Sequence, residues 1–95
     1  MALSARAVAD VEAAADWYAD RHPDGLDRFS NDFGRMLNML SLFPTAGRER
    51  PEFRHGLRSL PVHPFVAFYT VNAEHEQVAV VRVLHGHLDI EALDF

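Results

Sequence analysis

GLRSLPVHPFVAFYTVNAEHEQVAVVRVLHGH, residues 56–87, contains two runs rich in valine or aromatic residues, which favour strands, and a third run before them. The runs predict strands at about 57–62, 65–72 and 77–84. A turn of hairpin length joins the last two, so we expect them to be antiparallel. Neither long run alternates cleanly between apolar and polar residues, as a strand with one solvated face would. Both faces of the predicted sheet therefore need to be covered.

Two amphipathic helical patterns precede these strands. Ser4 is a good N-cap for a first helix that runs to about Arg21 or His22. Pro23 then interrupts the pattern, Asp24 caps a second helix, and Pro44 ends that helix. Because the connection is only two or three residues long, the two helices should form an antiparallel hairpin. The apolar stripe of the second helix consists of Leu26, Phe29, Phe33, Met36, Leu37, Leu40 and Phe43.

The chain has 95 residues, which is enough for one domain with a thin core. We expect an α+β fold with the order (β)-α-α-β-β-β, in which the helical hairpin packs on one face of a small antiparallel sheet. The opening strand, which ends at Leu3 or Ser4, should be very short or missing. The predicted parts of this single domain, residues 1–95, are the hairpin at about 4–43, a loop at 44–56, the strands at about 57–84 and a C-terminal tail at 85–95.

Several classes of protein have no support in the sequence. The chain lacks cysteine, which excludes disulfides and thiolate metal sites. No apolar run approaches the roughly 18–20 residues that span a bilayer, and a helical pattern begins too close to Met1 to leave room for a signal peptide. Phosphate-binding glycine loops, GxSxG elbows and CxxC pairs are also absent. We therefore expect a cytoplasmic protein with no membrane association and no cofactor.

The predicted sheet has more apolar surface than the rest of the chain can cover. Two helices cover one face, and only the loop and the tail remain for the other. We therefore expect an exposed, concave apolar face that another molecule covers, with a homodimer through this face as an alternative. In the last strand Val78, Val80, Arg82 and Leu84 should share one face, and Ala79, Val81, Val83 and His85 the other.

The charge distribution is uneven. The net charge is -5, and the nine basic residues are all arginine. This acidity argues against a protein held to nucleic acid by bulk electrostatics. Residues 45–63 nevertheless carry Arg48, Arg50, Arg54 and Arg58 against only two glutamates, so a basic patch on an acidic body is expected.

Four residues suggest a site for phosphodiesters. Arg58, Arg82, His85 and His87 lie where adjacent strands could bring them together. Arginine binds phosphate and stabilises charge in its transition state, and histidine transfers protons near neutral pH. In the simpler interpretation, Arg82 extends from a sheet face, Arg58 pairs with an acid such as Glu52 or Asp89, and the histidines cap the strand end. A shared metal at His85, His87 and His63 is not favoured, and we expect no metal site.

These parts, in this order, resemble the RelE/ParE toxin superfamily over nearly the whole chain. The closest branch is ParE, whose members typically show a Gly-Arg-x-Arg-Pro-Glu loop, a Gly-Leu-Arg-Ser strand and an Arg-Val-Leu-His-Gly end. The matching segments here are Gly47-Arg48-Glu49-Arg50-Pro51-Glu52, Gly56-Leu57-Arg58-Ser59, Val66-Ala67-Phe68-Tyr69-Thr70-Val71 and Val81-Arg82-Val83-Leu84-His85-Gly86-His87. The resemblance implies a toxin of a type II toxin-antitoxin pair, which a small antitoxin wraps and neutralises.

Two activities compete within this superfamily, and the chain is an enzyme under only one of them. ParE-like members poison DNA gyrase, whereas RelE-like members cut mRNA in the ribosome. The RelE reading implies that Arg58, Arg82 and His87 are catalytic. Arginine in place of loop lysine and the lack of a C-terminal tyrosine favour the ParE reading. The remaining residues that we expect to bind partners are Arg48, Arg50, Arg54, Phe68, Tyr69 and His85.

Three departures from the family pattern suggest an alternative, an inactive homologue that is retained as an interaction module. The opening strand is short, the net charge is acidic, and Leu88 stands where many relatives carry arginine. The expected assemblies are a homodimer or a toxin-antitoxin hetero-oligomer.

Overall fold

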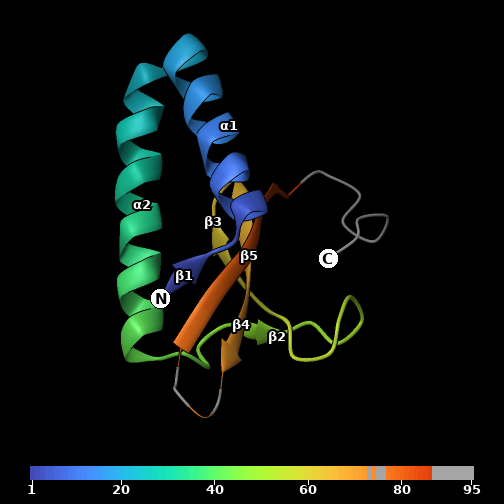
Figure 1. Ribbon diagram of the computed structural model, residues 1–95. Coiled ribbons are helices and arrows are strands. Elements are labelled where there is room, and N and C mark those ends of the chain that lie inside the picture. The colour runs from blue at the N-terminus through green and yellow to red at the C-terminus, as the bar shows by residue number, and fades with distance from the viewer. Residues whose placement is uncertain (73, 75–76, 87–95) are drawn as a thin grey trace.

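The computed structural model describes residues 1–72, 74 and 77–86, and it confirms an α+β fold (Figure 1). Two helices lie side by side on one face of a five-stranded sheet. The elements are β1 (Ala2–Leu3), α1 (Ala5–Arg21), α2 (Pro23–Leu42), β2 (Arg48–Glu49), β3 (Arg58–Val62), β4 (Phe65–Asn72) and β5 (Gln77–His85).

The helix boundaries follow local signals in the sequence. The Ser4 hydroxyl accepts a hydrogen bond from the Ala7 N–H at 3.0 Å, as an N-cap does, and it donates to the Val81 carbonyl at 2.8 Å. Pro23 occupies the first turn of α2, where its missing N–H is not needed. The N-cap of α2 is His22, which makes no side-chain cap bond, so the prediction that Asp24 caps this helix is wrong. Asp24 instead lies in the first turn, where its charge suits the helix dipole.

The sheet is mixed, which corrects the predicted all-antiparallel arrangement. Its strand order is β1-β5-β4-β3-β2, and β1 pairs with β5 in parallel while the other pairs are antiparallel. The helical hairpin supplies the crossover that a parallel pair needs. The opening strand is present as only two residues, and a second two-residue strand, β2, lies inside the segment predicted to be a loop.

A β-bulge in β5 changes which residues face the helices. Phe68 pairs with Arg82 and Tyr69 pairs with Val80, so Val81 is the extra residue. The bulge reverses the alternation beyond this point. Val83 therefore joins the core under the helices and Leu84 joins the cluster on the far face, contrary to the predicted assignment.

The main core lies between the helical hairpin and the sheet. Its buried residues are Ala7, Ala14, Phe29, Met36, Leu40, Val62, Ala67, Tyr69, Val78, Val80 and Val83. Among the described residues, no helix combines the length and the apolar character needed to cross a membrane.

The far face of the sheet carries a smaller apolar cluster of its own. Phe68 and Leu84 are buried there, and the partly buried Phe53 packs edge to face against Phe68 with ring centroids 6.1 Å apart. Phe53 and Leu57 belong to the segment that follows β2, which folds back over the strands. The prediction of an exposed apolar face is therefore wrong for the described residues. Among the described residues, the exposed large apolar side chains belong to the N-terminus, the two helices and the residue after α2. They are Met1, Val8, Trp17, Met39, Leu42 and Phe43.

Candidate functional site

Of the four residues predicted to converge, the three that the structure describes do not form one cluster. Arg58 lies on β3 and Arg82 on β5, with β4 between them. His85 is half-buried at the end of β5, with its ring 5.4 Å from the ring of Phe65. His87 lies outside the described residues.

Arg58 holds the segment that leads into β2. Its Nη1 donates to the carbonyls of Thr45 at 3.2 Å and Gly47 at 2.9 Å, and its Nη2 lies 3.5 Å from Glu49 Oε1. The acidic neighbour of Arg58 is therefore Glu49 and not Glu52, which pairs with Arg50. Because most of its N–H donors already bond groups of this chain, Arg58 mainly holds residues 45–49 in place against β3.

Arg82 forms a two-point ion pair with Asp10 of α1. Its Nε and Nη2 donate to the two carboxylate oxygens at 2.8 and 3.0 Å, and Asp10 also accepts the Val83 N–H at 2.9 Å. The two charged side chains are only 14% and 15% exposed. The hydrogen bond to Asp10 raises the pKa of Arg82, so the guanidinium stays charged. The geometry gives Arg82 a structural role, because it ties α1 to the bulge of β5.

Arg50 lies on the far face of the sheet above the small apolar cluster. Its guanidinium carbon is 4.8 Å from the ring centroid of Phe53, and its Nη1 donates to Ser59 Oγ at 3.1 Å. Its Nε donates to Glu52 at 3.1 Å. A backbone hydrogen bond at Glu52 is the main cause of the lowered pKa of that residue, and Arg50 adds to it. Arg50 thus fixes the covering segment by stacking and by hydrogen bonds.

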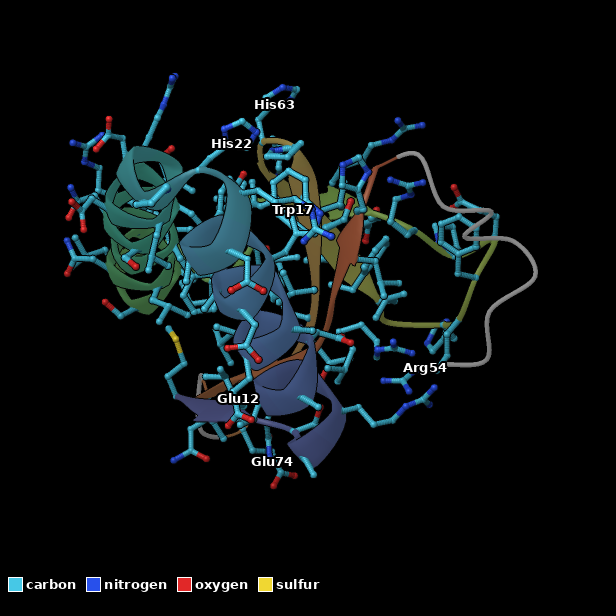
Figure 2. All side chains as sticks on the ribbon, turned by 90° about the horizontal axis from the view of Figure 1, so that it is seen from above. Glu12, Trp17, His22, Arg54, His63 and Glu74 are labelled. Carbon is cyan, nitrogen blue, oxygen red and sulfur yellow. The ribbon has the colours of Figure 1, made fainter. Side chains whose placement is uncertain are left out.

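The other predicted contact residues divide into exposed and buried ones. Arg48 and Arg54 are exposed, and Arg54 lies on the side of the sheet opposite α2 (Figure 2). Phe68 and Tyr69 are both completely buried, which removes them from the surface that a partner can contact in this conformation.

Two residues that position the predicted site residues, Gly47 and Asp10, were not predicted from the sequence. Gly47 was quoted only as part of a motif, yet its N–H donates to the buried Tyr69 hydroxyl at 2.7 Å. Burial raises the pKa of Tyr69 above its ordinary value. Asp10 was not singled out at all, because its partner Arg82 is 72 residues away along the chain and no local pattern marks the pair. The glycine of the Gly-Arg-x-Arg-Pro-Glu segment was the one available signal.

A cleft of about 790 Å³ lies between the end of α2 and the segment that follows β2. Arg58, His55 and Glu49 supply its charged or titratable groups, and Leu42 and Val71 are among its apolar walls. Within residues 1–72, 74 and 77–86, no three acidic or histidine side chains are grouped so that they could hold a metal ion. Arg58 and Arg82 are already bonded to groups of this chain and lie on separate strands, so the two guanidinium groups do not face one common ligand site.

Comparisons with known proteins agree with this architecture. The sequence model of a family described as the ParE toxin of the type II toxin-antitoxin system parDE matches residues 1–90. A curated relative, Toxin ParE3 of Caulobacter vibrioides, is 37% identical over 62 residues, which are 65% of this chain and 60% of the relative. The chain thus spans less than two thirds of the length of that relative.

A solved structure titled as a chromosomal ParDE TA system from P. aeruginosa has the same fold. The TM-score is 0.71 and the sequence identity is 23%, with 88% of this chain and 91% of the other covered.

Proposed function

We propose that this chain, which belongs to the ParE family of toxins of type II toxin-antitoxin systems, arrests growth by binding DNA gyrase and is neutralised by a cognate antitoxin. The observation that carries the proposal is the family match over residues 1–90. The proposed site of action is the cytoplasm, where gyrase meets DNA.

The geometry supports a binding poison over a nuclease. Arg58 bonds the carbonyls of its own loop, and Arg82 is paired with Asp10. A ribonuclease would need these guanidinium groups to face one phosphate, since they stabilise charge only at short range. The relative titled as a ParDE system supports an antitoxin as the partner.

The decisive experiment is controlled expression of the chain in a bacterium, with and without the small gene that neighbours it. We expect growth arrest that the neighbouring gene relieves, and purified protein that blocks supercoiling by gyrase while leaving RNA intact. Unimpaired growth on induction would contradict a toxin and would favour an inactive interaction module.

The ribonuclease alternative makes a separate prediction. If the chain cut mRNA in the ribosome, a translation extract would show defined cleavage products that disappear with Arg58→Ala. We expect no such products. Their appearance with the wild-type protein would replace gyrase by the ribosome as the target.

A further inference from the structure

The sheet separates two apolar cores, and an irregular segment closes the smaller one. The main core lies under the helical hairpin, whereas Leu57, Phe68 and Leu84 are buried on the far face. Residues 50–56, which we call the cover, fold over this far-face cluster, and Arg54 marks their position in Figure 2. Because the strands lie between the two cores, the cover can leave the far face without disturbing the packing of the helices.

The apolar attachment of the cover depends on Phe53. This side chain is half-buried and packs on the ring of Phe68, whereas the other residues of 51–56 are exposed. The stabilisation from burial scales with the apolar area removed from water, so a half-buried ring contributes less than a buried one. The cover is therefore held by far less apolar contact than the helices are.

Arg50 connects the cover to the sheet through several groups at once. Its Nη1 donates to Ser59 Oγ of β3, and its guanidinium carbon lies 4.8 Å from the ring centroid of Phe53 and 5.9 Å from that of Phe68. Its ion pair with Glu52 adds little, because the Glu52 side chain is 49% exposed. Arg50 thus bridges the cover to both β3 and β4, and its release would free the cover.

The end of the cover has the backbone and the space that a hinge needs. Gly56 has a φ of +81°, and a Cβ at this position would meet no atom within 4 Å. Glycine changes its backbone angles more readily than any other residue. Pro51, His55 and Gly56 line the cleft of about 790 Å³, so space also lies beside the cover.

We propose that the cover opens as a unit about Gly56 while the helices and the sheet stay folded, and that Arg50 is the latch that holds it closed. Opening a segment that loses few apolar contacts requires less free energy than global unfolding. The open form uncovers Phe68, which is completely buried in the closed form. The predicted contact of Phe68 with a partner is then possible only in the open form. The inference goes beyond the proposed function and holds whether or not the chain arrests growth.

Native-state hydrogen exchange of the unmodified chain tests the opening. The Arg50 N–H donates to the Leu57 carbonyl at 2.8 Å, and the Leu57 N–H donates to the Arg54 carbonyl at 3.2 Å, so both bonds must break when the cover opens. After correction for intrinsic rates, we expect both N–H groups to exchange at least about a hundredfold faster than those of the central strand β4, with one shared opening constant that low urea hardly changes. Protection and urea dependence equal to those of β4, or different opening constants at the two positions, would overturn the proposal.

A thiol placed under the cover gives an independent measure of the same opening. The chain has no cysteine, so Ser59→Cys introduces a single thiol at a position that is 5% exposed and lies beneath Arg50. Val80→Cys, completely buried under the helices, is the matched control. We expect a maleimide to label Ser59→Cys at least about a hundredfold faster than Val80→Cys in the absence of urea. Equal labelling rates would contradict an opening that is confined to the far face.

A pair of charge-conserving variants tests the latch. Arg50→Lys keeps the positive charge but loses the planar group that stacks and bonds at once, so exchange of the Leu57 N–H should become about tenfold faster. Arg48→Lys, at an exposed position of β2, should leave that rate unchanged. Equal effects of the two substitutions would show that Arg50 is not the latch.

A variant in the main core separates opening of the cover from unfolding of the whole protein. Leu37 of α2 packs against the main core, so Leu37→Ala should make the N–H groups of β4 exchange at least about tenfold faster. It should leave the Leu57 N–H unchanged, because the open and closed forms keep this core equally. An equal acceleration at Leu57 and in β4 would mean that the cover opens only with the whole protein, and would overturn the proposal.

Discussion

Gly47 lies so close to the buried Tyr69 side chain that its position leaves no room for a Cβ atom. The N–H donates to the Tyr69 hydroxyl, and a Cβ at this position would lie 2.8 Å from the Ser59 carbonyl oxygen and closer still to that hydroxyl. Glycine is required here by close packing. The contact joins the loop before β2 to the centre of the sheet, and Arg58 bonds the Gly47 carbonyl from the other side.

The substitution Gly47→Ala should therefore destabilise the fold. We expect a loss of about 2–3 kcal/mol in the free energy of unfolding, because the added methyl group overpacks the site and breaks the bond to Tyr69. Urea unfolding measures the loss. Gly34→Ala is the matched control, since no atom lies within 4 Å of a Cβ there, and it should stabilise α2 by about 0.5–1 kcal/mol. Equal effects at both glycines would contradict the packing argument.

Tyr69 predicts a pH dependence of stability. Burial raises the pKa of the folded state above the ordinary value of about 10, so folding favours the protonated phenol. The stabilisation is therefore complete below about pH 10 and is lost as the pH rises toward the pKa of the folded state.

Tyr69→Phe removes this titration and leaves the Gly47 N–H without its acceptor. We expect the variant to be less stable by about 1–2 kcal/mol at pH 8, and to lose less further stability than the wild-type protein by pH 11. Urea unfolding at the two pH values provides the comparison. Parallel losses in both proteins would show that Tyr69 does not titrate with unfolding.

Among the elements, α1 is attached to β5 by hydrogen bonds at two neighbouring positions of that strand. Ser4 bonds the carbonyl of Val81, and Asp10 bonds Arg82 and the N–H of Val83. These contacts meet β5 at its bulge, where the strand lacks the regular alternation that would otherwise position it. The bulge and the helix therefore stabilise one another.

Asp10→Ala tests this attachment. It leaves the Arg82 charge and the Val83 N–H without their partner, so we expect a loss of about 2–3 kcal/mol in urea unfolding. Asp16→Ala, at an exposed position of the same helix, should change stability by less than about 0.5 kcal/mol. The double variant Asp10→Ala with Arg82→Leu should lose less than the sum of the single losses. A full sum would indicate that the two residues do not interact.

The segment after β2 acts as the cover of the far face. Phe53→Ala should remove its main contact with Phe68 and lower the free energy of unfolding by about 2–3 kcal/mol. Phe43→Ala is the control, because Phe43 is 63% exposed, and it should have little effect. If the two phenylalanines behaved alike, the segment would contribute no packing to the far face.

For the whole molecule, the negative net charge opposes nucleic acid binding more than the basic patch at residues 45–63 favours it. The net charge is -5, and Arg50 and Arg58 in residues 45–63 already bond groups of this chain. Few cations remain to displace counterions from a phosphate backbone.

The protein should therefore not be retained by duplex DNA at about 0.15 M salt. A gel-shift assay with a basic protein of similar size as the positive control measures this. A shifted band would mean that the patch at residues 45–63 binds nucleic acid on its own. It would then be necessary to reconsider DNA itself as a partner.

Local signals in the sequence determined the two helices, the three long strands and their order. Ser4, Pro23 and Pro44 mark helix boundaries within a few residues of themselves, and the apolar periods act over one or two turns. The resemblance of the chain to known toxins also depended on such short segments. These features needed no knowledge of which distant residues meet.

Only the tertiary structure decided the parallel pairing of β1, the bulge at Val81, the partner of Arg82 and the cover provided by Phe53. The prediction that Arg58 and Arg82 cluster was wrong for the same reason. The sequence does not show that Arg58 bonds the Gly47 carbonyl or that Arg82 bonds Asp10. Propensity acts between neighbours along the chain. Hydrogen bonds and ion pairs form between groups that are brought within about 3 Å of each other by packing, however far apart they lie in sequence.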